Sequence, residues 1–234
     1  MKISILITNY NKYSYLRKTL NSVLSQNYKN FEIIVFDDKS TDDSVNLIKK
    51  FKKVKLILNK KKKIKNAPLL NQNNGIVEAF KYSKGKIICL LDSDDLFNKN
   101  KLSCINKFFK KNKNKNFVVN FPKTKKFIPK DKLNEQNYQR WPFIFPTSCI
   151  SFRRDFFNKF LKYSKYKEFK DLGIDARLIM YAKFYCNDHN IIKNLLNTYS
   201  LNKRGNYAKY NHLGKNWWIS RNEAFEYLKY ILKL

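Results

Sequence analysis

Two short acidic segments stand out in a chain that is otherwise strongly basic. Its 234 residues include 49 Lys and Arg against 18 Asp and Glu, and seven of the 18 lie in VFDDKSTDD (35–43) and LLDSDD (90–95). Each segment follows an apolar run typical of a buried parallel strand. Adjacent carboxylates repel unless a cation or hydrogen-bond donors stabilise them, and their oxygens are ligands of hard divalent cations. Because ligands of open α/β sheets bind at the carboxyl ends of the strands, we expect a site where these segments meet.

Strand and helix patterns alternate around these acids. Strands are predicted at 3–7, 31–36, 54–58 and 87–91. Helices are predicted at 14–26, 71–83 and 99–109, with a further one capped by Ser40 or Thr41, and the lysine run 60–65 predicts an exposed loop. This alternation implies right-handed crossovers and a mostly parallel sheet flanked by helices, so the predicted fold class is α/β.

The pattern weakens beyond residue 110, where an irregular region spans 122–146 before a helix predicted at 174–185. A last amphipathic helix is predicted at 216–234. Its apolar face consists of Trp218, Phe225, Leu228, Ile231 and Leu232. We expect this helix to dock on the core as a C-terminal extension, with an interfacial membrane helix as the alternative.

The formal charge of +31 raises nucleic acid as a partner, because Lys and Arg neutralise phosphates. Lys and Asn are however scattered over the whole chain together with Ile, Tyr and Phe, which indicates a compositional bias instead of one basic stripe. We therefore expect no specific nucleic-acid partner. Peripheral contact with anionic membrane lipids is a further alternative that also suits an enzyme.

The four cysteines form no CxxC pair and no metal-ligand spacing with the two histidines, so we expect reduced, mostly buried thiols. No apolar stretch reaches the ~18 to 20 residues that a membrane span requires. The opening residues run into a strand pattern without a signal-peptide layout. These patterns predict a cytoplasmic protein that contacts the inner face of the membrane at most peripherally.

The segment ISILITNYNKYSYLRKTLNSVLSQNYKNFEIIVFDDKSTDDS resembles the nucleotide-binding opening of the family-2-type inverting glycosyltransferases, which have the Rossmann-like GT-A fold, and LLDSDD resembles their DxD motif. The resemblance covers roughly the first hundred residues. It implies a nucleotide-sugar-binding half at 1–110, an acceptor-binding half of the same domain at 111–215 and a C-terminal helix at 216–234. The implied reaction moves a sugar from a UDP-sugar to a hydroxyl of a bacterial surface glycan or lipid-linked oligosaccharide.

For the DxD segment, the resemblance implies that Asp94 and Asp92 bind Mn²⁺ or Mg²⁺, which bridges the donor's two phosphates. Asp92 is also a candidate for contact with the ribose, Ser93 belongs to the same binding segment, and Asp95 is a neighbour able to share either role. The alternative is a helix N-cap box, in which these side chains bind the unpaired amides of a following helix.

The resemblance also implies a base pocket, in which Tyr10 stacks on uracil and Asp38 accepts the imino hydrogen of the ring. An ordinary surface aromatic is the alternative for Tyr10. Lys39 replaces the glycine common in the family after the aspartate pair, and LNQNNGI lacks the family's arginine. The full set of implied donor contacts is Thr8, Tyr10, Asn11, Asp37, Asp38, Asn74, Asp92, Ser93 and Arg204.

An inverting transfer needs a general base for the acceptor hydroxyl. The resemblance points to Asp175 in KDLGIDARLIMYAK, with Asp171 as second choice and Arg177 as a partner for either acid. The alternative for Asp175 is a first-turn acid stabilised by the helix dipole. His212 is a further candidate for contact with metal or diphosphate, and Trp217 with Trp218 for stacking on sugar or packing of the last helix.

Two other classes of function stay open at this point. One is a basic nucleic-acid-binding protein whose charge is its function. The other is a scaffold that binds nucleotide sugar with little turnover.

Overall fold

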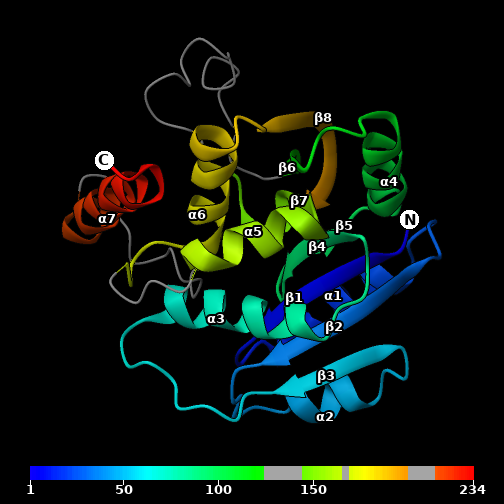
Figure 1. Cartoon of the computed structure of the whole chain (residues 1–234). Helices are drawn as coiled ribbons and strands as arrows, with labels where there is room; N and C mark the ends of the chain where they lie inside the picture. The colour runs from blue at the N-terminus through cyan, green and yellow to red at the C-terminus, as the bar shows by residue number, and fades with distance from the viewer. Residues whose placement is uncertain (124–143, 165–168, 200–213) are drawn as a thin grey trace.

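An eight-stranded sheet lies at the centre of the computed structural model, which describes residues 1–123, 144–164, 169–199 and 214–234 (Figure 1). The order of its strands is β3-β2-β1-β4-β7-β6-β8-β5. The strands are β1 (Ile3–Asn9), β2 (Phe31–Asp37), β3 (Val54–Leu58), β4 (Ile87–Asp92), β5 (Leu96–Phe97), β6 (Phe117–Lys123), β7 (Ile150–Arg153) and β8 (Asn190–Thr198).

The helices cover both faces of this sheet, so the predicted α/β class is confirmed. They are α1 (Tyr13–Leu24), α2 (Ser44–Lys49), α3 (Pro68–Lys81), α4 (Lys101–Lys111), α5 (Arg154–Ser164), α6 (Ile174–Met180) and α7 (Lys215–Leu232). A 3₁₀ turn, η3 (Thr147–Cys149), precedes β7, and a π-helical turn, η4 (Tyr181–Tyr185), extends α6. The segment predicted as one helix at 174–185 is thus α6 continued by a π turn.

Alternate residues of each central strand enter opposite layers of the core, as the two-residue period of a strand requires. Ile5 and Ile7 pack with apolar side chains of α1, α2 and α4, whereas Leu6 packs with those of α3, α5 and α6. Figure 1 shows α3 and α5 in front of the sheet. Burial of each such large apolar side chain contributes about 1.5–3 kcal/mol, which makes this sheet a rigid support for the loops at its edge.

The parallel part of the sheet brings three strand ends together. β1 pairs in parallel with β2 on one side and with β4 on the other. Asn9 lies opposite Asp37, and Thr8 lies opposite Asp92. The two acidic segments therefore flank the end of β1 at one edge of the sheet, as their positions after apolar runs predict.

The first half of the chain follows the predicted order of elements, but one cap differs. Ser40 and Thr41 do not begin a helix, because α2 starts at Ser44 with Asp43 as its N-cap residue. The Ser40 hydroxyl donates to Asp37 instead, at 2.7 Å. The carboxylate competes for this hydroxyl within the turn and leaves the cap to a later residue.

The last helix docks on the core as predicted, and three residues of the predicted face take part, with Leu228 and Leu232 partly buried beside Ile231. Ala224, Tyr227 and Ile231 of α7 are buried in the layer formed with α5 and α6. Trp218 and Phe225, predicted to face the core, are 51% and 48% exposed. Within the described part of the chain, no helix combines the length and the apolar character needed to cross a bilayer.

Candidate active site

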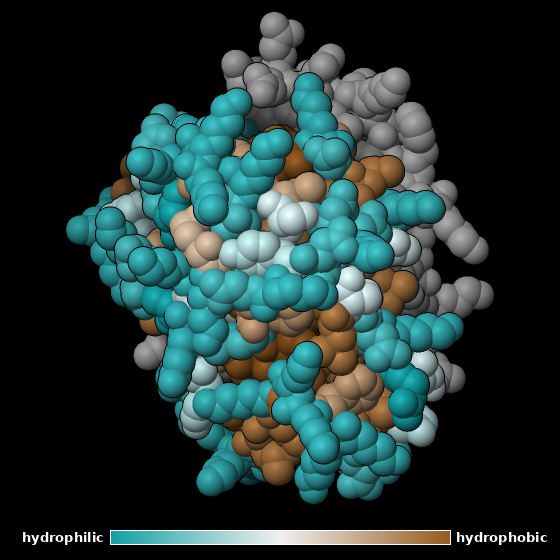
Figure 2. Space-filling view, turned by 90° about the vertical axis from the view of Figure 1, so that its right-hand side faces the viewer, coloured by the Kyte–Doolittle hydropathy of each residue, from teal (hydrophilic) through white to brown (hydrophobic). Residues whose placement is uncertain are grey.

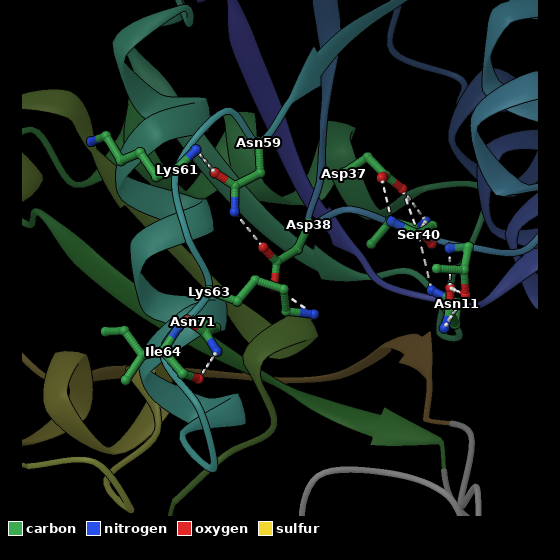
Figure 3. Close-up of polar contacts among 11 residues, drawn as sticks. Asn11, Asp37, Asp38, Ser40, Asn59, Lys61, Lys63, Ile64 and Asn71 are labelled. Atoms are coloured by element: carbon green, nitrogen blue, oxygen red, sulfur yellow. Dashed lines mark hydrogen bonds and ion pairs between the residues drawn. The ribbon is translucent and has the colours of Figure 1, made fainter.

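Asp37 organises the loops that follow β1 and β2 (Figure 3). Its carboxylate accepts hydrogen bonds from Asn9 Nδ2 at 2.8 Å, from the Ser40 amide at 2.9 Å and from Ser40 Oγ at 2.7 Å. The side chain is buried, so these protein donors replace the water that a carboxylate otherwise needs. Asp37 was predicted to contact the sugar donor, but its carboxylate is hydrogen-bonded to other residues of the protein.

Asn11 joins the same two loops from the other side. Its Oδ1 accepts the Thr41 amide at 2.8 Å, and its own amide donates to Ser40 Oγ at 3.0 Å. Asn11 and Lys39 both adopt left-handed backbone, with φ of 51° and 60°. Lys39 thus adopts the left-handed conformation that glycine adopts without steric cost. For a residue with a side chain, this conformation costs roughly 1–2 kcal/mol.

The side chains of Tyr10 and Asp38 both contact the ammonium group of Lys63. Lys63 Nζ lies 3.1 Å from the centroid of the Tyr10 ring and 3.2 Å from Asp38 Oδ2. Asn59 Nδ2 donates to the other oxygen of Asp38 at 2.6 Å, and Figure 3 shows both partners reaching Asp38 from the segment after β3. The predicted stacking residue and the predicted acceptor are therefore adjacent, with a displaceable lysine between them.

The segment that carries Lys63 is held against α3. Asn71 of α3 donates from Nδ2 to the Ile64 carbonyl at 2.8 Å and accepts the Ile64 amide at 3.1 Å (Figure 3). The sequence predicted only an exposed lysine loop here. Neither Lys63 nor Asn59 belongs to the segments that resemble the family, so the sequence did not predict their contacts with Asp38.

Repelling carboxylates gather at the end of β4. Burial raises the pKa of Asp92 well above the usual value of a carboxyl group, and repulsion from nearby acids raises it further. Those acids are Asp95, Asp94 and Asp175. The DxD segment and the predicted base, more than 80 residues apart in sequence, thus act on one another electrostatically.

Three further side chains hold this acidic cluster (Asp92, Asp94, Asp95 and Asp175), and the sequence pointed to none of them. Gln72 Nε2 donates to Asp92 Oδ1 at 2.7 Å, and the Asp92 amide donates to Ser148 Oγ at 3.0 Å. Lys12 Nζ lies 2.6 Å from Asp94 Oδ2. The predicted contact Ser93 is buried, and its carbonyl accepts the Thr19 hydroxyl at 2.9 Å.

Asp175 is buried at the start of α6, where its Oδ1 accepts the Ala176 amide at 2.8 Å. An acid in the first turn of a helix is also stabilised by the helix dipole. Arg177 is buried and donates to the Leu172 and Ser164 carbonyls at 3.1 and 3.3 Å, which fixes the loop before α6. Asp171 lies instead against α7, where its amide donates to Glu223 Oε2 at 2.7 Å.

Tyr199 follows β8 and lies beside the same acids. Burial raises its pKa, and the negative charges of the acidic cluster raise it further. Its phenol therefore stays protonated and can donate a hydrogen bond into the cluster. No motif marked this tyrosine.

The predicted contact Asn74 is exposed in the middle of α3, apart from these groups. Close packing explains the glycine at the neighbouring position 75, because a Cβ on Gly75 would lie 2.8 Å from Phe36 Cδ1 and 3.0 Å from Thr8 Cγ2. Thr8, another predicted contact, thus packs where α3 meets the sheet. The predicted residues Arg204 and His212 lie outside the described residues.

The donor set suits a hard divalent cation. Asp92 and Asp94 offer carboxylate oxygens, and their mutual repulsion would fall if a cation bound between them. Among the described residues, no three His, Cys, Asp or Glu side chains form a ready-made metal cluster.

The family model described as Glycosyl transferase family 2 matches residues 4–184. The chain is 41% identical over 101 residues to the Escherichia coli UDP-Glc:alpha-D-GlcNAc-diphosphoundecaprenol beta-1,3-glucosyltransferase WfaP, covering 43% of this chain and 38% of that protein. It is 34% identical over 98 residues to a Campylobacter jejuni GalNAc(5)-diNAcBac-PP-undecaprenol beta-1,3-glucosyltransferase, covering 40% and 30%. An uncharacterized glycosyltransferase of Rickettsia bellii is 44% identical over 117 residues, which are 50% of this chain and 16% of that protein. The chain thus spans only part of the length of these relatives.

Solved structures share the fold over nearly the whole chain. S. aureus TarS 1-349 in complex with UDP superposes with a TM-score of 0.74 at 16% identity, covering 99% of this chain and 65% of that one. The mannosyltransferase PcManGT from Pyrobaculum calidifontis, in complex with GDP-Man and Mn²⁺, gives 0.67 at 14% identity, covering 99% and 74%. The predicted GT-A fold is confirmed by this likeness.

Proposed function

Because the chain belongs to glycosyl transferase family 2, we propose that it moves a sugar from a UDP-sugar to a hydroxyl of a bacterial surface glycan or lipid-linked oligosaccharide, with inversion at the anomeric carbon. One observation carries this proposal: the acids of the DxD segment and Asp175 form one electrostatically coupled cluster at the strand edge. That edge is where open α/β sheets bind ligands.

The donor's uracil stacks on Tyr10, and Asp38 accepts the imino hydrogen of the ring. The two side chains support this role because both already contact one ammonium group, that of Lys63, which marks a common point between them. Asn11 and Asp37 contribute by fixing the loops that carry Tyr10 and Asp38. The TarS structures with UDP and with UDP-GlcNAc show nucleotide and nucleotide sugar bound to a protein of this fold.

Asp94 and Asp92 would hold Mn²⁺ or Mg²⁺ through their carboxylate oxygens. A bound metal would supply positive charge against the negative charge that develops on the departing diphosphate. Gln72 orients the Asp92 carboxylate through its 2.7 Å hydrogen bond, and Ser148 fixes the backbone of the same residue. These contacts hold the ligand oxygens in place before the donor arrives.

Asp175 is the general base. Its carboxylate takes the proton of the acceptor hydroxyl as that oxygen forms a bond to the anomeric carbon, while the bond from this carbon to the UDP oxygen breaks. UDP leaves with the electron pair of the broken bond. The position of Asp175 near Asp92 supports this role, because the base must lie beside the donor's sugar.

The acceptor is bound at the cytoplasmic face of a membrane, which the protein contacts peripherally. Two relatives carry undecaprenol-linked acceptors in their names, and the charge of +31 favours an anionic lipid surface. Figure 2 shows hydrophilic side chains spread across one face of the molecule, with apolar patches between them. Such a spread is expected of general surface attraction and not of a specific nucleic-acid groove.

The proposal is tested with a transfer assay. The protein is incubated with Mn²⁺, a polyprenyl-diphosphate-linked GlcNAc acceptor and, in separate reactions, UDP-glucose and UDP-GlcNAc. We expect released UDP and a product heavier by one hexose or N-acetylhexosamine, with a β linkage by NMR. An α linkage would contradict inversion, and binding of UDP-sugar without turnover under any acceptor would favour the scaffold.

A further inference from the structure

An ammonium group of the protein itself lies at the predicted metal ligand. Lys12 Nζ is 2.6 Å from Asp94 Oδ2, and the two side chains are 20% and 15% exposed. Lys12 immediately precedes α1, so its main chain is fixed next to the acidic cluster. Its charge also acts on Asp92, where it lowers the pKa against the effect of the acids. The ion pair is therefore part of the donor site and not a distant surface contact.

A lysine and a divalent cation compete for such an oxygen. Asp94 Oδ2 accepts the ammonium at 2.6 Å, and this positive charge would repel a divalent cation at the same carboxylate. The ion pair with Lys12 therefore opposes metal binding at Asp94. Because the lysine stem is flexible and ends in a compact charge, the ammonium can move several ångströms without a change in the main chain.

Lys12 is also suited to a diphosphate. The first amide of α1, that of Tyr13, already donates to Asp42 Oδ2 at 2.9 Å, so the Lys12 ammonium and not the helix terminus is the group suited to a phosphate oxygen. The nearby Lys101 differs, because it is fully buried and donates to Asn120 Oδ1 at 2.8 Å and to the Ser148 carbonyl at 2.6 Å. Lys101 is thus fixed beneath the acids, whereas Lys12 lies at their accessible side.

We propose that Lys12 is a built-in cation of the donor site: it neutralises Asp94 in the nucleotide-free protein and turns to the donor's diphosphate when the nucleotide binds. This inference rests on the proposed function for the identity of its anionic ligand. It assigns Lys12 a binding role that neither the motifs nor the relatives point to.

The inference has two consequences of opposite sign. Removal of the ammonium should strengthen metal binding in the absence of nucleotide, because the competitor for Asp94 is lost. The same change should weaken nucleotide binding in the absence of metal, because a cation for the diphosphate is lost. A residue that only supports the fold would lower both affinities together.

The test uses Lys12→Met in the full chain, with Lys18→Met as the matched control, because Lys18 is exposed on α1. Mn²⁺ affinity without nucleotide is measured by electron paramagnetic resonance, and UDP affinity in EDTA by calorimetry. We expect Lys12→Met to bind Mn²⁺ about fivefold more tightly and UDP about tenfold more weakly, the sizes of one partly buried ion pair and one charge-assisted hydrogen bond. Lys18→Met should match the wild type in both measurements, and Lys12→Arg should retain UDP binding in EDTA.

Equal Mn²⁺ affinity in the wild type and Lys12→Met would overturn the inference, and so would unchanged UDP affinity in EDTA. Thermal melting of each variant shows whether the fold is retained, and Lys12→Gln provides a second uncharged side chain. A wild type that binds no UDP even with Mn²⁺ would contradict the proposed function. In that case the Mn²⁺ comparison still decides whether Lys12 competes for Asp94.

Discussion

The acids after β2 and the acids after β4 lie at the same edge of one sheet, but their surroundings are opposite. Asp37 accepts three hydrogen bonds from Asn9 and Ser40. Asp92 has one side-chain donor, Gln72, and three acidic neighbours that raise its pKa. Hydrogen-bond donors surround the first carboxylate, whereas like charges destabilise the ionised form of the second.

This difference separates two roles that look alike in sequence. A carboxylate saturated with donors ties its own loops together and contributes to the stability of the fold. A carboxylate crowded by other acids costs stability and is typical of a functional site, where a bound cation relieves the repulsion. Substitutions that remove each charge should therefore change stability in opposite directions.

The largest effect is expected for Asp175, the acid of the second half of the chain that lies near the DxD segment. Asp175→Ala should lower the rate of transfer by about 10²–10⁴-fold, because the acceptor hydroxyl loses its base. UDP affinity should stay within about twofold of the wild type, since the proposed donor contacts are untouched. Steady-state kinetics and calorimetry measure the two quantities. Asp171→Ala is the control, and an equal loss of rate in it would transfer the role to Asp171.

For the saturated carboxylate, Asp37→Asn should destabilise the fold by about 2–3 kcal/mol. The new amide group would face the donors of Asn9 and Ser40 instead of accepting from them. Urea unfolding measures the change. The exposed Asp43→Asn is the control, with an expected change under about 0.5 kcal/mol. Similar changes in unfolding free energy for both variants would show that the hydrogen bonds of Asp37 contribute little to stability.

For the crowded carboxylate, Asp92→Asn should stabilise the fold by about 1 kcal/mol while it impairs metal-dependent UDP binding. The folded-state pKa of Asp92 is raised, so the native protein holds this proton more tightly than the unfolded chain does. Its contribution to stability therefore falls as pH rises from the ordinary carboxyl pKa to the raised one. Urea unfolding should show a larger gain for Asp92→Asn at pH 8 than at pH 5. A loss of stability at pH 8 would mean that the repulsion is already relieved.

The smallest expected effect concerns the lysine between Tyr10 and Asp38. Lys63→Met should raise UDP affinity about threefold to tenfold. In the wild type, uracil must displace the contacts of Lys63 with Tyr10 and Asp38, which together contribute about 1 kcal/mol, and the variant lacks these contacts. The exposed Lys62→Met should leave the affinity unchanged. Calorimetry in the presence of Mn²⁺ compares the variants. Weaker binding by Lys63→Met would instead make Lys63 a donor contact.

The sequence predicted the strands of the first half and the edge where the acids meet, because apolar runs and parallel register leave little choice there. It did not predict Gln72, Lys12 or Tyr199, which reach the acids from other elements through contacts that no local pattern encodes. It assigned different ligands to the two acidic segments but did not predict that donors surround Asp37 whereas acids crowd Asp92. The donors of Asp37 come from the end of β1 and from the loop after β2, and this loop includes the left-handed residue Lys39.

The wrong prediction that two residues of α7 face the core has a similar cause. Ile231 is buried as predicted, but Trp218 and Phe225 are exposed. Ala224 and Tyr227 are buried at the contact in their place. Periodicity identifies that a helix is amphipathic without fixing which of several aromatic residues meets its neighbour. In a chain with 15 Tyr and 19 Phe, both faces of a helix can offer apolar surface.

The central claim, a UDP-sugar site at the end of β1, β2 and β4, is tested most directly by calorimetric titration of UDP into the wild-type protein. The titration is made with Mn²⁺ and again with EDTA, with GDP and CDP as controls. The account predicts saturable binding that is selective for UDP and tighter with Mn²⁺. Absence of binding by every nucleotide under both conditions would contradict it.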